Sequence, residues 1–188
     1  MDLRVFILLL AFAANFVVAG SSLAATLRPS ALVGLMTPPS SQYYHYVYGG
    51  QIDLARRFDS SLMRIQYLQR PAYSKSGYTD QDFSALGMVG TSVMGKKEYG
   101  VTALLGGGYV WGYIKASENL NDKNSYKLPG LAVAIEARWS PKFIDVRFAH
   151  QVLIGHEAQD QLKAYVAWPF NWFVLSAAYP ISFGGRAR

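Results

Sequence analysis

Three histidines and the absence of cysteine limit the chemistry that this chain of 188 residues can perform. The histidines are His45, His150 and His156, and the lack of Cys excludes disulfides, thiolate metal sites and cysteine nucleophiles. The segment HQVLIGHE places His150, His156 and Glu157 close together, but this spacing matches no standard metal-binding motif. We therefore expect no metal site and no cofactor.

Glycine and basic residues do not indicate phosphate or nucleic-acid binding. Residues 104–112 (LLGGGYVWG) are glycine-rich, but no helix follows them, so they do not form a phosphate-binding loop. The net charge is +6, yet adjacent basic residues occur only at Arg56 and Arg57 and at Lys96 and Lys97. This thin distribution favours solvated rims near anionic lipid headgroups over a nucleic-acid groove, so no nucleic-acid partner is expected.

The composition is apolar and aromatic, but the body of the chain has no hydrophobic segment of helix length. Hydrophobic residues make up 51% of the chain, aromatic residues 14% and charged residues 16%, which excludes a disordered chain. After the signal-like start no run of 18 apolar residues occurs, so a bundle of transmembrane helices is also excluded. The length suits a single domain.

The first 25 residues have the layout of a secretory signal peptide. Arg4 precedes a nearly continuous apolar stretch over residues 5–19, and small residues follow. A single N-terminal membrane anchor is the alternative, although the stretch is short for a membrane span. The predicted division of the chain is a signal peptide (1–25), an N-terminal leader (26–42), a β-barrel (43–183) and a C-terminal tail (184–188).

Beyond the leader, apolar residues recur at every second position, which is the period of a β-strand. Tyr99, Val101 and Ala103, for example, share one face of a predicted strand. Gly100 and Thr102 lie on the other face. This alternation predicts eight strands, at residues 45–58, 62–70, 83–94, 99–114, 131–140, 143–154, 161–170 and 172–183. The fold class is therefore all-β, and eight is the smallest usual number of strands in a membrane barrel.

The residues on the other, less apolar face of the predicted strands indicate whether the apolar face points into the barrel or outward. The less apolar face is dominated by Gly, Ala and Ser with a few charges of both signs, whereas a soluble barrel would present Lys, Glu, Asp and Thr to water. Small residues and scattered charges suit the interior of a narrow barrel, and branched aliphatic and aromatic residues suit lipid. We therefore expect an eight-stranded antiparallel up-and-down transmembrane β-barrel with its apolar face outward.

Several charged residues are expected to point into this barrel and to form ion pairs, because buried charges need partners of opposite sign. They are Asp53, Arg57, Arg64, Glu136, Arg138, Asp145, Arg147 and Lys163. A two-residue turn at 141–142 would place Arg138 opposite Asp145. It would also place Glu136 opposite Arg147. The pairs can fill and rigidify the interior or line an ion path, and the narrow bore favours filling.

Aromatic residues at the strand ends predict two girdles at the membrane interfaces, because Trp and Tyr combine apolar bodies with polar tips. If the first predicted strand starts in the periplasm, the periplasmic girdle contains Tyr46, Tyr48, Trp111, Tyr113, Tyr179 and Phe183. The outer girdle then contains Trp139, Trp168 and Phe170. Ordinary aromatic packing in a β core is the alternative.

The last predicted strand provides a link to a known family. The segment FVLSAAYPISF places apolar or aromatic residues at Phe183 and at every second position back to Phe173. This pattern resembles the C-terminal strand signature of bacterial outer-membrane β-barrels, although the tail GGRAR follows the aromatic residue that usually ends the chain. The whole mature chain resembles the small eight-stranded barrels of this family. The resemblance implies an integral outer-membrane location in a Gram-negative bacterium, contact with membrane lipids and lipopolysaccharide, and insertion by the outer-membrane assembly machinery.

The connections between the predicted strands conflict with the layout of that family. The long connections are residues 71–82, 115–129 and 156–160, and they fall on the same side as both termini. In outer-membrane barrels the long loops face outward. Either the barrel is atypical, or residues 27–37 add a strand, or one strand assignment is wrong.

A structural or loop-mediated binding role without catalysis is our first functional hypothesis, because the segments 71–82 and 115–129 are polar and rich in turn residues. The second is a lipid-modifying enzyme, because VRFAHQV loosely resembles the strand of lipid A deacylases that carries the histidine of a His/Ser/Glu triad. In that motif Ser stands two residues after the histidine, where this sequence has Val152 after His150, so the nucleophile is missing. The third is a soluble periplasmic barrel with an apolar pocket for a small lipid.

Overall fold

The computed structural model describes residues 25–37, 44–56, 59–75, 78–116, 123–141, 143–155 and 170–183. Apart from Ala25, the predicted signal peptide lies outside these ranges, as does the predicted C-terminal tail. Within the described ranges the regular elements are β-strands. No helix among these residues is long and apolar enough to cross a membrane.

Nine strands follow one another along the described chain. They are β1 (Ala25–Thr37), β2 (His45–Ala55), β3 (Leu62–Lys75), β4 (Tyr78–Gly95), β5 (Tyr99–Ala116), β6 (Lys123–Trp139), β7 (Asp145–Gly155), β8 (Phe170–Ala178) and β9 (Ile181–Phe183). Each strand from β1 to β7 pairs antiparallel with the next.

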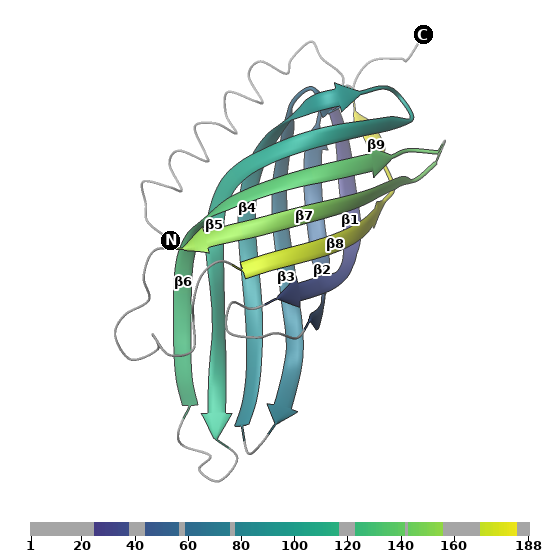
Figure 1. Ribbon diagram of the computed structural model, residues 1–188. Helices are drawn as coiled ribbons and strands as arrows, with labels where there is room; N and C mark the ends of the chain where they lie inside the picture. Colours follow the sequence, from purple (N-terminus) through teal and green to yellow (C-terminus); the bar gives the residue numbers. More distant parts are fainter. Residues whose placement is uncertain are drawn as a thin grey trace.

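The sheet closes because β1 has partners on both sides (Figure 1). It pairs with β2 along one edge and with β8 and β9, placed end to end, along the other. Tyr179 and Pro180 separate β8 from β9, which together form the eighth strand of the barrel. The predicted fold class, an eight-stranded antiparallel barrel, is confirmed.

The strand ladder is staggered around the barrel. The row of paired residues that starts at Thr26 passes through β2 to β8 and returns to β1 at Met36, ten residues further along. A closed sheet with such a stagger requires strands that tilt relative to the barrel axis.

Glycines of the segment 104–112 allow β4 and β5 to approach closely. A Cβ atom at Gly106 would lie 2.0 Å from the carbonyl oxygen of Gly87, and one at Gly108 would lie 2.2 Å from that of Ala85. A side chain at either position would push the two strands apart. These glycines therefore have a structural role in the barrel wall, where they allow two strands to pack closely.

The structure corrects the topology predicted from the sequence at two places, the first strand and the seventh predicted strand. Residues 25–37, most of which the sequence pattern places in a leader, form strand β1. Residues 161–169 lie outside the described ranges, and β7 pairs directly with β8, so the predicted strand at 161–170 has no place between them. The alternative that residues 27–37 add a strand is therefore confirmed, and the described part of the barrel includes residues 25–37.

The added first strand removes the conflict over the loops. One end of the barrel, here called the terminus side, holds the start of β1, the end of β9 and the connections 56–61, 96–98 and 140–144. The opposite end, the loop side, holds the segments 71–82 and 115–129 and the connection after β7. The long segments thus lie opposite the termini, as they do in outer-membrane barrels.

Four strands are longer than the others on the loop side. Strands β3 to β6 contain 14, 18, 18 and 17 residues, whereas β1, β2, β7 and β8 contain 13, 11, 11 and 9. Figure 1 shows β3 to β6 extending below the remaining strands. We call their extended ends, residues 71–75, 78–82, 112–116 and 123–127, the projecting sheet. Most residues predicted to be loops at 71–82 and 115–129 are therefore strand residues.

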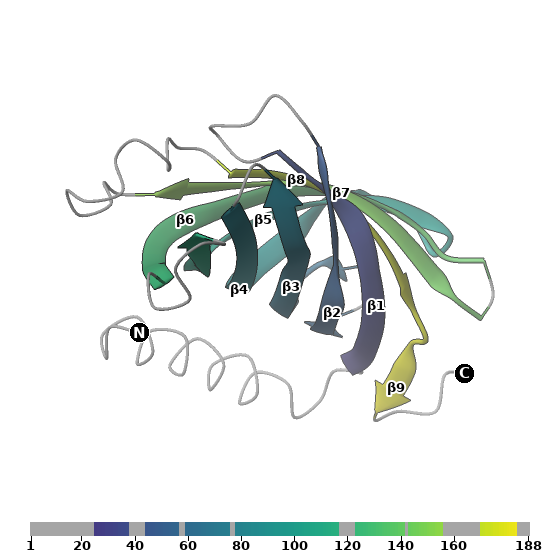
Figure 2. The same cartoon turned by 90° about the horizontal axis from the view of Figure 1, so that it is seen from below.

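The outer wall is apolar and the interior holds the charges. Viewed from the loop side, the strands surround a common interior (Figure 2). Large exposed hydrophobic residues on the outer face include Val33, Ile52, Ile65, Leu105, Ile135, Phe148 and Leu175. Ile135 is 60% exposed, whereas its chain neighbour Glu136 is buried. This distribution is the reverse of that in a soluble barrel and fits a wall that faces lipid.

Candidate functional site

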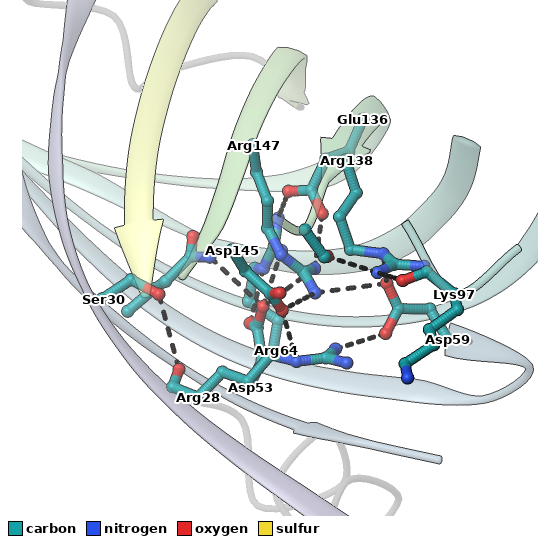
Figure 3. A network of polar contacts seen from close by, with 12 residues as sticks. Arg28, Ser30, Asp53, Asp59, Arg64, Lys97, Glu136, Arg138, Asp145 and Arg147 are labelled. Atoms are coloured by element: carbon teal, nitrogen blue, oxygen red, sulfur yellow. Dashed lines mark hydrogen bonds and ion pairs between the residues drawn. The ribbon is translucent and has the colours of Figure 1, made fainter. Parts of the chain in front are cut away.

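A network of charged side chains fills the terminus-side half of the interior (Figure 3). Its members, here called the terminus-side network, are four arginines and four carboxylates: Arg28, Arg64, Arg138, Arg147, Asp53, Asp59, Glu136 and Asp145. All eight residues are buried. Equal numbers of both signs let each buried charge lie beside an opposite one, which offsets the loss of hydration.

Arg64 joins two carboxylates from different strands. Its Nε and Nη2 atoms donate to the two oxygens of Asp53 at 2.7 and 2.9 Å, and its Nη1 lies 2.6 Å from Glu136 Oε2. Asp53 and Arg64 are direct cross-strand neighbours on β2 and β3. The planar guanidinium can therefore hold one partner through two parallel hydrogen bonds and still reach the other.

Arg147 on β7 is the most connected member of the network. Its Nη1 donates to Glu136 Oε1 at 2.6 Å and lies 3.3 Å from Asp53 Oδ2. Its Nη2 donates to Asp59 Oδ2 at 3.2 Å and to Asp145 Oδ2 at 3.5 Å. One side chain thus links β2, the β2–β3 turn, β6 and β7 across the interior.

Asp59 reaches the network from a turn rather than from a strand. It has a φ of 58°, in the left-handed region, which Asp tolerates better than most residues. Arg28 donates to one of its oxygens, and Arg138 Nε lies 3.1 Å from the other. Burial alone would raise the pKa of Asp59, but the charges of Arg147, Arg28 and Arg138 together hold this pKa below its usual value.

A glutamine pair lies next to the charged network. Gln66 on β3 and Gln151 on β7 exchange two hydrogen bonds of 2.8 Å across the barrel. Gln51 donates to Asp53 at 3.2 Å and so joins this layer to the charges. The three amides form a polar layer across the middle of the interior.

The loop-side half of the interior is mainly apolar. Its buried residues include Leu32, Met36, Val47, Leu68, Val110, Leu128, Leu153, Phe170 and Trp172. The rings of Phe170 and Trp172 stack at 5.8 Å. A cavity of about 10 Å³ remains beside Trp172, which is the lower limit for a single water molecule. A space of this size does not admit a hydrated ion.

A second, smaller ion cluster closes the loop-side end of this apolar layer. Arg70 Nε donates to Asp82 at 2.5 Å, and Arg70 Nη2 donates to Asp80 at 2.7 Å. Arg70 and Asp82 are cross-strand neighbours on β3 and β4. Sequence reasoning missed this cluster because it assigned Asp80 and Asp82 to a loop, although their Asp–x–Asp alternation continues the period of two.

The structure brings together most of the charges that were predicted to face inward. Asp53, Arg64, Glu136, Arg138, Asp145 and Arg147 all belong to the terminus-side network. Arg57 and Lys163 lie outside the described residues. Sequence reasoning missed Arg28, because it lies in the supposed leader, and Asp59, because it lies in a turn.

The predicted pairing of the β6–β7 hairpin is wrong. Arg138 lies opposite Arg147 rather than Asp145, because the connection between the strands spans residues 140–144 instead of the two expected turn residues. Glu136 and Arg147 still meet, diagonally across the ladder, at 2.6 Å. The carboxylate partner of Arg138 is Asp59.

The predicted levels of the aromatic girdles also need correction. Tyr46, Tyr48, Trp111 and Tyr113 lie toward the loop side, at the opposite end from Tyr179 and Phe183. Trp139 lies on the terminus side. Phe170 points into the barrel with 3% exposure, because it shares the inward face of β8 with Trp172. Trp168 lies outside the described residues.

His150 lies on the outer wall among apolar residues. Its ring stacks on Phe173 at 4.6 Å, and its neighbours in the ladder are Ile135 and Phe173. Neither neighbour carries a nucleophile or a carboxylate. In the described part of the chain, no group of three or more His, Asp or Glu residues is arranged to hold a metal ion.

Comparison with known proteins identifies the class of fold. No protein-family model matches the chain, and no curated protein matches it. Among solved structures, Ail of Yersinia pestis is similar with a TM-score of 0.60 at 10% identity, covering 85% of this chain and 99% of Ail. A major outer-membrane protein of Thermus thermophilus is similar with a TM-score of 0.57 at 12% identity, covering 84% and 99%.

Neisserial surface protein A is similar with a TM-score of 0.54 at 10% identity, covering 83% of this chain and 97% of that protein. The chain therefore has the fold of the small outer-membrane β-barrels. This agreement extends to almost the full length of the solved barrels and fits the predicted outer-membrane location.

Proposed function

We propose that this protein is a non-enzymatic, integral outer-membrane barrel that keeps its interior closed and presents the projecting sheet outside the membrane for a structural or binding role. The observation that carries the proposal is the contrast between the plugged interior and the four strands that extend beyond the rim. An eight-stranded barrel has little open bore, and here charges and large apolar side chains occupy it.

The outer wall supports membrane insertion. Exposed aliphatic residues occur on strands around the barrel, and a soluble protein rarely exposes so many large apolar side chains. Membrane lipids and lipopolysaccharide are the partners that such a wall requires. We expect the assembly machinery to recognise the segment of β8 and β9, because its apolar residues alternate.

The loop side supports a binding role. Lys127 lies over the ring of Tyr109 with its Nζ 4.6 Å from the ring centre, and Tyr67, Phe83 and Trp111 form an aromatic cluster with ring separations of 5.8–6.4 Å. Aromatic and charged residues on rigid strands offer preorganised contacts to a partner. One solved structure of Ail contains the heparin analogue sucrose octasulfate, which makes this compound a suitable first probe.

The outer-membrane location and the closed interior of the barrel are tested by one set of experiments. We expect the full chain to fractionate with the outer membrane, to show heat-modifiable gel mobility, and to give no stable conductance in planar bilayers. Release of the protein by salt as a soluble species, or steady single channels, would contradict the proposal.

The binding role is tested by shortening a hairpin. Gly112 and Tyr126 are ladder partners. Residues 113–125 can therefore be replaced by a two-residue Asn-Gly turn without changing the barrel from which the projecting sheet extends. We expect the shortened protein to remain heat-modifiable but to bind sucrose octasulfate and a glycan array more weakly, because it keeps Lys127 and the aromatic cluster at the base of the sheet but lacks the ladder pair Lys115 and Lys123. The matched control replaces the terminus-side residues 96–97 with Asn-Gly, which leaves the projecting sheet unchanged. Equal binding by the full and the shortened barrel would contradict the role of the sheet.

A further inference from the structure

The net positive charge of the chain is concentrated in the segments of the terminus side. The terminus-side network is balanced, and the loop-side segments 70–82, 115–127 and 156–163 carry six basic and six acidic residues. Apart from Asp59, which is counted with the network, the connections at 56–61, 96–98 and 140–144 and the tail 184–188 contain seven basic residues and one acidic residue, and their sum equals the net charge of +6: Arg56, Arg57, Lys96, Lys97, Lys142, Arg186, Arg188 and Glu98. This asymmetry indicates an anionic partner at the terminus side.

Among the segments of this basic region, the β4–β5 turn at 96–98 is described in full. Arg138, a member of the terminus-side network, donates from Nη2 to the carbonyl oxygen of Lys96 at 3.0 Å. Its Nη1 donates to the carbonyl oxygen of Lys97 at 3.3 Å (Figure 3). Lys96 N donates to Tyr99 O at 2.7 Å, and Ser140 N donates to Glu98 O at 2.7 Å. The interior network thus fixes the backbone of the turn, while the side chains of Lys96 and Lys97 remain exposed.

A belt of exposed apolar side chains borders this turn. Trp139, the ladder partner of Tyr99, is 59% exposed, and Phe143 on the neighbouring turn is 74% exposed. Val93 and Met94 immediately before the turn are exposed as well. Lysine ammonium groups beside apolar surface on a membrane protein mark the level where acyl chains meet headgroups.

We propose that the Lys96–Lys97 turn binds the phosphate of an anionic phospholipid in the membrane leaflet on the terminus side, with the acyl chains against the apolar belt around Trp139 and Phe143. The proposal rests on the proposed membrane location. The two ammonium groups outweigh the exposed carboxylate of Glu98. A soluble acidic polymer would match the charge but leave the apolar belt uncovered, whereas a phospholipid satisfies both surfaces.

The experiment compares two lipids and two pairs of lysines. The mature barrel, stripped of lipid in uncharged detergent, is titrated with phosphatidylglycerol or phosphatidylcholine of identical chains, and bound lipid is counted by native mass spectrometry. We expect tighter binding of phosphatidylglycerol. Because each lysine near an anionic surface contributes about a fivefold gain, K96S/K97S should lower this affinity about 25-fold, while K96R/K97R should keep it. The control K123S/K127S removes the same charge from the loop side and should leave it unchanged.

Three results would overturn the inference: equal affinity for both lipids, no loss in K96S/K97S, or the same loss in K123S/K127S. Binding to isolated peptidoglycan that depends on Lys96 and Lys97, without lipid selectivity, would also overturn it in favour of an acidic polymer. Heat-modifiable mobility and membrane fractionation of the same proteins separate this test from the proposed function. A barrel that passes both but lacks the lysine dependence refutes the lipid site alone.

Discussion

The terminus-side half of the interior is filled by four arginines and four carboxylates, whereas the loop-side half is filled mainly by leucine, methionine, phenylalanine and tryptophan. Both halves close a narrow barrel, but they rely on different interactions. The charged half depends on complementary ion pairs, whose loss leaves buried charges without partners. The apolar half depends on packed volume, whose loss leaves a cavity.

The charged half also organises the turns at its end of the barrel. Asp59 enters it from the β2–β3 turn, and Arg138 binds the backbone of the β4–β5 turn. Thr91 donates to Ser60 O at 3.0 Å and adds a link between β4 and the β2–β3 turn. The loop-side half instead supports strands that continue beyond the rim. The comparison therefore separates a part that fixes the turns from a part that carries the projecting sheet.

The largest effect is expected from R147M, because Arg147 contacts four carboxylates. Removal of its charge leaves these groups buried with fewer partners, which should lower the free energy of unfolding by about 3–5 kcal/mol. Urea unfolding in detergent micelles, followed by tryptophan fluorescence, measures this loss. R147K keeps the positive charge but lacks the planar guanidinium, so its free energy of unfolding should lie between those of wild type and R147M. Wild-type stability in R147M would remove the basis for treating the network as structural.

The apolar half is tested by W172A. Trp172 is buried to 1% exposure and stacks on Phe170, so its truncation should cost about 3 kcal/mol. Unlike that of R147M, this loss should not change with salt concentration, because no charge is involved. The control is W139A on the outer wall, which opens no interior cavity and should cost less than about 1 kcal/mol in detergent. Equal losses in the two tryptophan variants would contradict the assignment of Trp172 to the interior packing.

The sequence could predict the faces of most strands but not the first strand. In β5, the alternation from Tyr99 to Tyr113 identified the outward face correctly, because a period of two is a local property. In β1, Pro29 and Gly34 interrupt the strand signal, and the segment is a strand because β2 and β8 pair with it on both sides. Phe170 was assigned to the wrong face because the apolar alternation before it suggested a separate strand.

The candidate site was predictable by residue type but not by partner. Inward positions of Glu136 and Arg147 followed from the alternation, yet the pairing of their hairpin depended on the length of one turn. Asp59 could not be found by alternation, because it lies in the turn between β2 and β3, where the period of two does not apply. Contacts between β2, β6 and β7 across the interior depend on closure of the barrel, which no local pattern encodes.

A smaller, pH-dependent effect is expected from D59N. Asn tolerates the φ of 58° but lacks the charge that three arginines contact, so the loss at neutral pH should be about 2 kcal/mol. Because the pKa of Asp59 is lower in the folded protein than its ordinary value of 3.8, its stabilisation is complete above that value and disappears as the pH falls through the folded pKa. The unfolding free energies of wild type and D59N should therefore converge below about pH 3.8, as measured by urea unfolding across a pH series. A difference that stays constant under acid would contradict the charged state of Asp59.

The smallest effect is expected from a double variant at the boundary between the two halves, where Gln66 and Gln151 exchange two hydrogen bonds. Q66L or Q151L alone leaves one buried amide without its partner and should cost about 1–3 kcal/mol. The double variant Q66L/Q151L removes both polar groups and extends the apolar layer by two leucines, so its stability should lie within about 1 kcal/mol of wild type. A double-mutant cycle from urea unfolding measures the coupling. If the two losses are additive, each glutamine must have polar partners besides the other glutamine. The pair would then belong to the charged half, because each leucine would leave such a partner unsatisfied whether or not the second substitution is present.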